Sequence, residues 1–291
     1  MGFFGQISRR AAVAGGLSFA LNPGFGARGW ARSDVIRFGL TPVFLDNDLS
    51  LLNRLRDFLR RQTGREVQLV QRRTYEEITS LLISGQLTAA WICGYPFTTY
   101  SKQLAIVAVP VWRGRPLYQS YLIVAADRSA AGLADLKHDL HAFSDPNSNS
   151  GYLVTIAALA NAKQRPEDFF RKTFFTYGHR NVVRAVASGL ADSGSVDGYV
   201  WEVISEIEPE LARQTKVIAR SEWLGFPPVA CLKRLKVSPD TRAVEHALLN
   251  MQADPDGAEV LRLLRLDGFV TARPDLYDGI AQKVREARSL G

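Results

Sequence analysis

The amino-acid sequence predicts an α/β protein with mainly parallel sheets. Short apolar runs typical of strands alternate along the chain with amphipathic stretches typical of helices, which is the pattern of layered α/β domains. Hydrophobic residues make up 46% and charged residues 22% of the 291 residues, as in ordinary globular proteins. The sequence has no repeat with a period of about 20–50 residues, which excludes a solenoid.

The first predicted elements are three strands and two helices. The strands are expected at residues 35–42, 66–72 and 89–93. The first helix places Leu51, Leu55 and neighbouring apolar residues on one face and ends at Gly64. The second helix begins at Thr74–Glu77, whose Thr-x-x-Glu pattern is typical of a capping box, and ends at Gly85.

The later elements continue the alternation. Two strands are expected on either side of the turn at Arg113–Pro116, and four strands and four helices follow them before two final amphipathic stretches. The expected strands are 104–112, 118–125, 140–143, 173–176, 195–200 and 216–220, and the expected helices are 151–162, 180–188, 201–207 and 240–251.

Residues 1–31 have the features of a signal peptide. Arg9 and Arg10 precede an apolar run, Ala11–Leu21, which is too short to cross the ~30 Å core of a bilayer. A small-x-small pattern ends at Ala31, so we expect cleavage near Ala31 and a mature protein in the periplasm. The paired arginines favour the twin-arginine route, and a general secretory signal stays open as the alternative.

The charge pattern gives no indication of nucleic-acid binding. The full chain has a formal charge of +7, and loss of the three arginines in residues 1–31 leaves 33 basic against 29 acidic residues. This scattered surplus is compatible with a small anionic ligand. His138 and His141 are interpreted as solvated, and no His or Cys pair has metal-ligand spacing, so neither a metal nor a cofactor is expected.

The most informative local pattern is Phe143–Gly151, Phe-Ser-Asp-Pro-Asn-Ser-Asn-Ser-Gly. A strand ends, Asp-Pro turns the chain, and Ser148, Asn149 and Ser150 stand directly before a helix. The free N–H groups and the positive dipole end of a helix bind anions, and the serine hydroxyls add neutral donors. An ordinary helix cap explains the same residues, so both interpretations stay open.

This pattern resembles a known family. Asp145–Leu153 is similar to the Asp-Pro-x-Ser-x-Ser-Gly-x-Leu signature of phosphate/phosphite/phosphonate-type periplasmic binding proteins of ABC transporters. The similarity extends from about Val35 to Pro228. The other segments that carry it are Gly114–Ser120, Leu133–Lys137, Gly178–His179 with Val183–Gly189, and Asp197–Glu202.

The resemblance implies a two-lobed, type II Venus-flytrap fold with a ligand cleft between the lobes. Lobe one would comprise residues 32–115 and 222–291, and lobe two residues 116–221. The protein would capture a small oxyanion, such as phosphate, phosphite or a phosphonate, for an ABC permease at the inner membrane. It would act as a monomer and would catalyse no reaction.

The resemblance also implies roles for individual residues. Ser148 and Ser150 would hold the anion together with the helix N–H groups, and His179 would donate to one of its oxygens. Asp197 would accept from a protonated oxygen or from the amino group of an aminophosphonate. Asn149 stands where family members often have Thr, and it too is expected in the site.

The walls of the site would come from three aromatic side chains, Phe44, Tyr95 and Tyr118. Cys93 is a departure from the family, because many members have an apolar residue or Gly there. A thiol directly before a helix N-terminus is expected to have a lowered pKa.

Three interpretations of Cys93 stay open. It is a small buried hydrophobe, it forms a disulfide with Cys231 in the oxidising periplasm, or it contacts the ligand. A branch of the family binds arsenite and signals to a membrane histidine kinase, so an arsenite-binding sensor using Cys93 is the alternative function. A Cys93, His179 and Asp197 constellation for nucleophilic catalysis lacks a recognised nucleophile motif, and the resemblance places Cys93 on the other lobe.

Overall fold

The computed structural model describes Met1, residues 35–42 and residues 49–289. Apart from Met1, the predicted signal peptide of residues 1–31, with its cleavage site, lies outside the described residues, as does Phe44. No helix among the described residues is long and apolar enough to cross a membrane.

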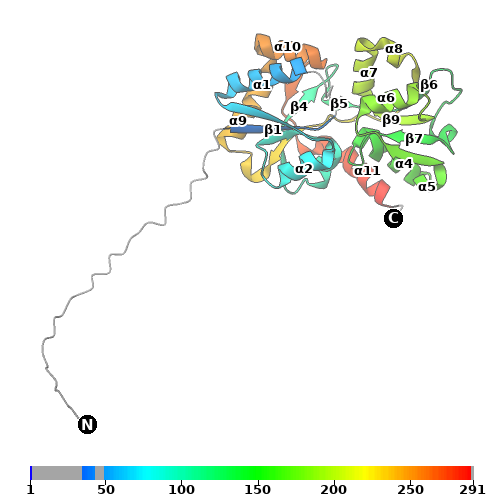
Figure 1. Ribbon diagram of the computed structural model, residues 1–291, viewed down its shortest axis with the longest axis horizontal. Coiled ribbons are helices and arrows are strands. Elements are labelled where there is room, and N and C mark those ends of the chain that lie inside the picture. The colour runs from blue at the N-terminus through cyan, green and yellow to red at the C-terminus, as the bar shows by residue number, and fades with distance from the viewer. Residues whose placement is uncertain (2–34, 43–48, 290–291) are drawn as a thin grey trace. The chain divides into compact units, whose positions relative to one another are not determined.

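The first sheet has six strands and is built from both ends of the described chain (Figure 1). Its order is β13-β4-β12-β3-β1-β2. The central strand β1 pairs in parallel with β2 and β3, whereas β12 and β13 join by antiparallel pairing. The strands are β1 (Val35–Leu40), β2 (Glu66–Gln71), β3 (Ala89–Trp91), β4 (Leu104–Val111), β12 (Val229–Leu232) and β13 (Gly268–Val270).

The second sheet has five strands from the middle of the chain, in the order β10-β6-β9-β7-β8. Here β7 pairs in parallel with β8 and β9, and β6 pairs antiparallel with β9 and β10. The strands are β6 (Ser120–Ala125), β7 (Leu140–Phe143), β8 (Lys172–Phe175), β9 (Ser193–Asp197) and β10 (Thr215–Arg220).

A short antiparallel pair, β5 (Leu117–Tyr118) with β11 (Leu224–Gly225), lies where the chain passes from one sheet to the other and returns. These passages explain why the expectation of mainly parallel sheets is wrong. A βαβ crossover within one sheet makes parallel neighbours, but strands that follow or precede a passage between sheets join them antiparallel. Both sheets are therefore mixed.

Helices cover both sheets. Figure 1 shows α1, α9 and α10 with the first sheet and α4 to α8 with the second. Helix α11 packs against both α3 and α4. The helices are α1 (Leu49–Thr63), α2 (Tyr75–Ile83), α3 (Gly94–Thr99), α4 (Val154–Asn161), α5 (Pro166–Phe169), α6 (His179–Ala187), α7 (Gly198–Ile207), α8 (Pro209–Ala212), α9 (Pro239–Leu249), α10 (Pro255–Leu264) and α11 (Asp278–Arg288).

Two local predictions from the sequence are confirmed. Helix α1 buries Leu51, Leu55 and their apolar neighbours along one face. At the start of α2, the Thr74 hydroxyl accepts the Glu77 N–H, and the Glu77 carboxylate accepts the Thr74 N–H. This reciprocal pair fixes the point at which the chain leaves β2 and turns into α2.

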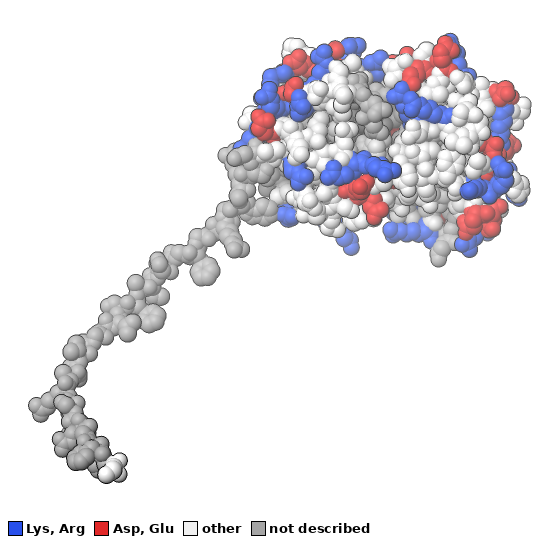
Figure 2. All heavy atoms as spheres, viewed as in Figure 1, with Lys and Arg blue, Asp and Glu red and all other residues white. Residues whose placement is uncertain are grey.

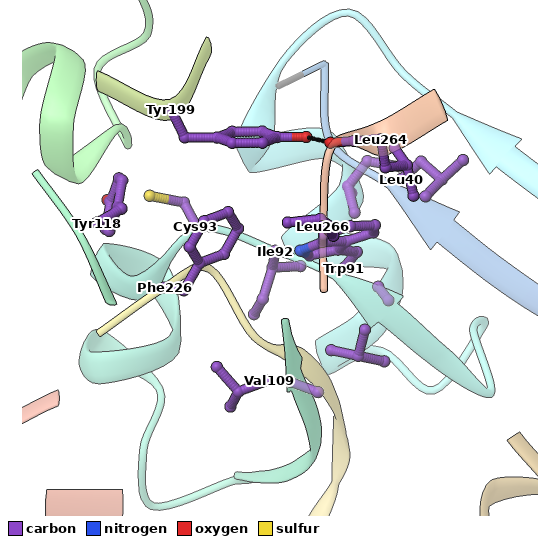
Figure 3. Packing of buried hydrophobic residues seen from close by; sticks show 14 of the residues in the cluster. Leu40, Trp91, Ile92, Cys93, Val109, Tyr118, Tyr199, Phe226, Leu264 and Leu266 are labelled. Carbon is purple, nitrogen blue, oxygen red and sulfur yellow. Dashed lines mark hydrogen bonds between the residues drawn. The ribbon is translucent and has the colours of Figure 1, made fainter. Parts of the chain in front are cut away.

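A continuous buried cluster connects elements of the two sheets (Figure 3). The Phe226 ring lies 5.5 Å from Tyr118 and 5.2 Å from Tyr199, measured between ring centroids. The Tyr199 hydroxyl, from α7, donates to the main-chain oxygen of Leu264 at the end of α10. Apolar packing thus surrounds the place where Cys93 and Tyr118 meet.

Candidate functional site

The polar residues predicted for the site meet at the ends of strands and the starts of helices. Cys93 follows β3, Ser148 follows β7, His179 is the first residue of α6, and Asp197 is the last residue of β9. Each of these side chains is at most 2% exposed. Ligands of α/β proteins bind at such strand ends, because helix N-termini converge there.

The Asp-Pro-x-Ser segment is both a helix cap and a set of donors. The Ser148 Oγ accepts the Gly151 N–H at 3.0 Å, which leaves its own hydroxyl proton for another acceptor. A π-helical turn, Asn149–Leu153, leads into α4. Gly151 is required there, because a Cβ would lie 1.9 Å from the Ser144 Oγ and 2.8 Å from the His179 Cε1.

Asn149 makes two hydrogen bonds within the cluster and leaves a third polar atom without a partner among the described residues. Its main-chain N–H donates to the Cys93 Sγ at 3.2 Å, and its Nδ2 donates to the Tyr118 hydroxyl at 2.9 Å. Its Oδ1 is buried and has no hydrogen-bond partner among the described residues. The next residue, Ser150, donates from its Oγ to the Asp197 Oδ2 over a long 3.4 Å.

The geometry fixes the tautomer of His179. The Asp197 main-chain N–H can only donate, so the His179 Nδ1, 3.0 Å away, accepts. Burial lowers the pKa of His179 to about 3, so the imidazole is neutral and carries its proton on Nε2. That Nε2–H lies 3.2 Å from the Tyr75 hydroxyl and is a neutral donor.

Asp197 is a buried carboxyl group whose two oxygens are unequally bonded, because Oδ2 accepts only the 3.4 Å contact from Ser150. Its Oδ1 accepts the Tyr199 and Val200 N–H groups and so caps α7. Burial raises its pKa to about 7, and those two N–H groups and Ser150 oppose the shift. The described chain has no buried Lys or Arg side chain, so no cation neutralises this carboxylate.

The expected low pKa of Cys93 is wrong. Burial raises its pKa to about 12, more than the Tyr95 and Asn149 N–H groups lower it, and the charges of Asp197 and Asp145 add to the increase. The group is therefore a neutral thiol, whose sulfur points towards Tyr118 (Figure 3). The disulfide interpretation is also wrong, because Cys93 and Cys231 are both free.

Tyr75 is a member of this cluster that the sequence interpretation missed. Its side chain is 1% exposed, and its main-chain N–H donates to the Asp145 Oδ2 at 3.2 Å. The signal for it was its position, since it begins α2 just beyond the carboxyl end of the parallel strand β2. Together with the Tyr75–His179 contact, this hydrogen bond joins α2 to the segments after β7 and β8.

The structure brings most of the predicted residues together. Ser148, Asn149, Ser150, His179, Asp197, Tyr118 and Cys93 lie in one cluster, held by the contacts given above. Tyr95 is partly buried, and its main-chain N–H donates to the Cys93 thiol.

A surface hollow lies near the first turns of α2 and α6. Its lining residues come from the ends of β1, β2 and β8 and the first turns of α2 and α6: Leu40, Pro42, Gln71, Arg72, Arg73, Glu77, Thr176, Tyr177 and Asn181. Tyr75 and His179 follow two of these lining residues, Arg73 and Tyr177, by two positions each. Figure 2 shows Lys and Arg interspersed with Asp and Glu on this view, rather than gathered in one basic surface.

Comparison with known proteins gives the family. Residues 38–277 match the model of the periplasmic substrate-binding proteins of phosphonate ABC transporters. The chain belongs to this family. The members of this family are periplasmic substrate-binding proteins of phosphonate ABC transporters.

Individual relatives agree with this assignment. The phosphate-import protein PhnD of Mycolicibacterium smegmatis is 28% identical over 148 residues, which are 47% of this chain and 46% of the relative. The binding protein of a Pseudomonas aeruginosa phosphonate transporter has a TM-score of 0.80 at 24% identity, covering 88% of this chain and 87% of the other. PhnD1 from Prochlorococcus marinus, solved with methylphosphonate, has a TM-score of 0.77 at 18% identity, covering 88% and 99%. These two structures have the same α/β fold, as predicted.

Proposed function

We propose that this protein captures one small phosphate-, phosphite- or phosphonate-type oxyanion between two lobes and presents it to an ABC permease. The observation that supports the proposal is the buried cluster of neutral donors around Ser148, His179 and the first turn before α4. Tyr75 and Tyr118 add two phenolic hydroxyl groups.

The chemistry of the cluster suits an oxyanion. The helix start before α4 offers main-chain N–H groups and the positive end of a dipole. The Ser148 hydroxyl and the His179 Nε2–H add directed donors that carry no charge. In a buried site with a low effective dielectric, such hydrogen bonds are stronger than they are in water.

The proposed ligand contacts come from both parts of the chain. We propose the lobes to be residues 32–115 with 222–291, and residues 116–221. Tyr75 and Cys93 then belong to one lobe, and Asp145, Asn149 and His179 to the other. A ligand that contacts both lobes stabilises the closed arrangement, since only that arrangement offers every contact.

Calorimetry on the mature chain beginning at Arg32 tests the proposal. The panel is inorganic phosphate, phosphite, methylphosphonate, 2-aminoethylphosphonate and arsenite. Saturable binding of one oxyanion per protein, with the ligand recovered unchanged, is expected. The predicted signal peptide lies outside the described residues, so export through the twin-arginine route is tested separately, by replacing Arg9 and Arg10 with Lys. Failure of every member of the panel to bind would contradict the proposed function.

A second candidate function is arsenite sensing for a membrane histidine kinase. The observation that favours it is the Cys93 Sγ, which sits in the cluster and accepts the Asn149 N–H. Arsenous acid would lose one hydroxyl as water while the thiol proton leaves, and an As–S bond would form. Thiols suit such a soft centre, and hydroxyls do not.

Cys93→Ser separates the two candidates. It should abolish arsenite binding and leave phosphate-type binding within a few fold, because a hydroxyl can also accept the Asn149 N–H. Cys231→Ser is the matched control, since Cys231 lies in β12 away from the cluster. Arsenite binding by Cys93→Ser as tight as by the wild type would contradict the sensor hypothesis.

A further inference from the structure

Helix α7, in the second of the two proposed lobes, carries three polar side chains that contact the first lobe. The Tyr199 hydroxyl donates to a main-chain oxygen at the end of α10 (Figure 3). The Glu202 Oε2 lies 3.1 Å from the Arg113 Nη2. The Glu206 Oε2 lies 2.7 Å from the Arg265 Nε. Positions three and four apart share one face of a helix, so this face of α7 meets the other lobe along its length.

Both arginines have backbone conformations that favour other residue types. The φ angle is 51° at Arg113 and 55° at Arg265. Arg113 lies in the turn between β4 and β5, and Arg265 is the C-cap of α10. Gly or Asn is usual at such left-handed positions, because a larger side chain is strained there. The partners of the two side chains therefore explain the arginines better than the turns do.

Three of these four charged groups are also held in place within their own lobe. The Arg113 Cζ lies 4.7 Å from the centroid of the Trp112 ring. The Arg265 Nη1 donates to a main-chain oxygen of α10 at 2.6 Å. In the second lobe, the Tyr121 hydroxyl donates to the Glu202 Oε1 at 3.0 Å. Charges that are already oriented lose little conformational freedom when the lobes meet.

We propose that Glu202 and Glu206 are positioning residues: their ion pairs with the two arginines latch the lobes together and raise the affinity for an oxyanion that neither glutamate touches. This inference rests on the two-lobed arrangement of the proposed function. Asp197 caps α7 at the candidate site. Glu206 lies about 13 Å farther along the same helix, at 1.5 Å per residue, which is beyond the reach of a small oxyanion bound at Asp197.

The latch acts through the equilibrium between open and closed lobes. Its ion pairs form only when the lobes are closed, so they favour the closed arrangement with or without a ligand. That arrangement offers every ligand contact, so a larger closed population raises the apparent affinity. The side chains of Arg113 and Glu206 are 56% and 51% exposed, so each pair should be of modest strength and sensitive to salt.

Ligand affinity and dissociation rate test the latch. Glu202→Gln and Glu206→Gln should each weaken phosphate binding by about two- to fivefold at low salt, and together by about tenfold, mainly through faster dissociation. Raising the salt from about 50 to about 500 mM should weaken binding by the wild type more than by the double variant. Glu259→Gln is the matched control, since its partner Arg262 lies on the same helix, and it should change neither quantity.

Arg113→Asn and Arg265→Asn separate the latch from a structural role. Asn adopts the left-handed conformation with less strain, so the urea midpoint should not fall, although phosphate should dissociate faster. Combining Arg113→Asn with Glu202→Gln should cost no more affinity than either change alone, because both remove the same ion pair. Fully additive losses, or a lower urea midpoint with unchanged dissociation, would overturn the inference.

Small-angle scattering of the ligand-free mature chain distinguishes this inference from the proposed function. The radius of gyration should be larger in the variant with both Glu202→Gln and Glu206→Gln than in the wild type. If the wild type binds an oxyanion and the double variant binds it equally tightly, only the inference fails. If the wild type binds no oxyanion, the proposed function fails and scattering alone decides: a larger radius in the double variant supports the latch, and an equal radius overturns it.

Discussion

Two buried histidines in the second sheet and its helices show how a structural polar cluster differs from a binding site. The His141 Nδ1 and Nε2 each lie 2.8 Å from a serine hydroxyl, those of Ser193 and Ser195, and Ser195 also bonds to Thr155. The His141 ring stacks on Phe170 with 4.4 Å between centroids. Every polar atom in this cluster is therefore engaged within one part of the molecule.

The cluster around His179 is different. The His179 Nε2 meets a phenol from another part of the chain, and the neighbouring Asn149 Oδ1 and Ser144 Oγ have no partner among the described residues. Burial lowers the pKa of both histidines to about 3, so the pKa does not distinguish them. The unpartnered groups do, because a site that binds a ligand must keep hydrogen-bonding capacity for it.

The largest expected effect is a loss of folding stability when the His141 cluster is disrupted. His141→Ala removes the partner of the Ser193 hydroxyl and one of the two partners of the Ser195 hydroxyl, and it opens a cavity beside Phe170. The free energy of unfolding should fall by about 3 kcal/mol. Urea unfolding measures this, and phosphate affinity of the folded protein should change less than twofold. His246→Ala, at an exposed helical position, is the control. A large loss of affinity in His141→Ala would show that the two clusters are coupled.

Removing a hydrogen-bond donor from the candidate site should instead weaken ligand binding more than it lowers stability. Ser148→Ala and Ser150→Ala each remove a protein hydroxyl group that is proposed to donate a hydrogen bond to a charged ligand. Such a hydrogen bond is worth about 1.5–3 kcal/mol, so phosphate affinity should fall about ten- to a hundredfold. Calorimetry measures the loss, and Ser84→Ala, exposed at the end of α2, is the control. If both site variants bind every oxyanion normally, the helix start is only a cap.

The pH dependence of stability tests the pKa shifts of both clusters. Each histidine has a folded-state pKa of about 3 and an ordinary value of 6.5, so the unfolded chain binds protons first and stability falls as the pH decreases from about 6.5. Asp197 opposes this, because its folded pKa of about 7 exceeds its ordinary 3.8 and the folded state gains that proton between pH 7 and 4.

The variant Asp197→Asn removes the opposing group. Its free energy of unfolding should fall more steeply between pH 6.5 and 4 than that of the wild type, by up to about 1.4 kcal/mol per pH unit. Urea unfolding at several pH values checks the slope. Equal slopes in the two proteins would mean that Asp197 has an ordinary pKa when folded.

The smallest expected effect uses the two cysteines. Both are buried thiols with raised pKa values, so both should react slowly with iodoacetamide. The proposed opening of the lobes would expose Cys93 but not Cys231, which lies in β12 of the first sheet. Saturating phosphate should therefore slow the alkylation of Cys93 and leave that of Cys231 unchanged, as mass spectrometry can measure. Equal protection of both thiols would point to global stabilisation instead.

The sequence by itself determined the elements whose signals are local. The apolar face of α1 and the capping box Thr74–Glu77 depend on residues three or four positions apart, so periodicity and cap chemistry were enough to predict them. The helix after Ser148 and its resemblance to a family signature gave the fold class and the centre of the candidate site. The short strands β12 and β13 were missed, because they lack a repeated pattern of their own.

Only the tertiary structure decided which of these residues act together. Burial, which depends on neighbours far away in the sequence, gave Cys93 a raised rather than a lowered pKa and made His141 a core residue instead of a solvated one. It also brought Tyr75 against His179, 104 positions away. Local sequence predicts which groups a helix start offers. Desolvation and hydrogen-bond partnership are set by the whole fold, and they determine which of those groups remain available to a ligand.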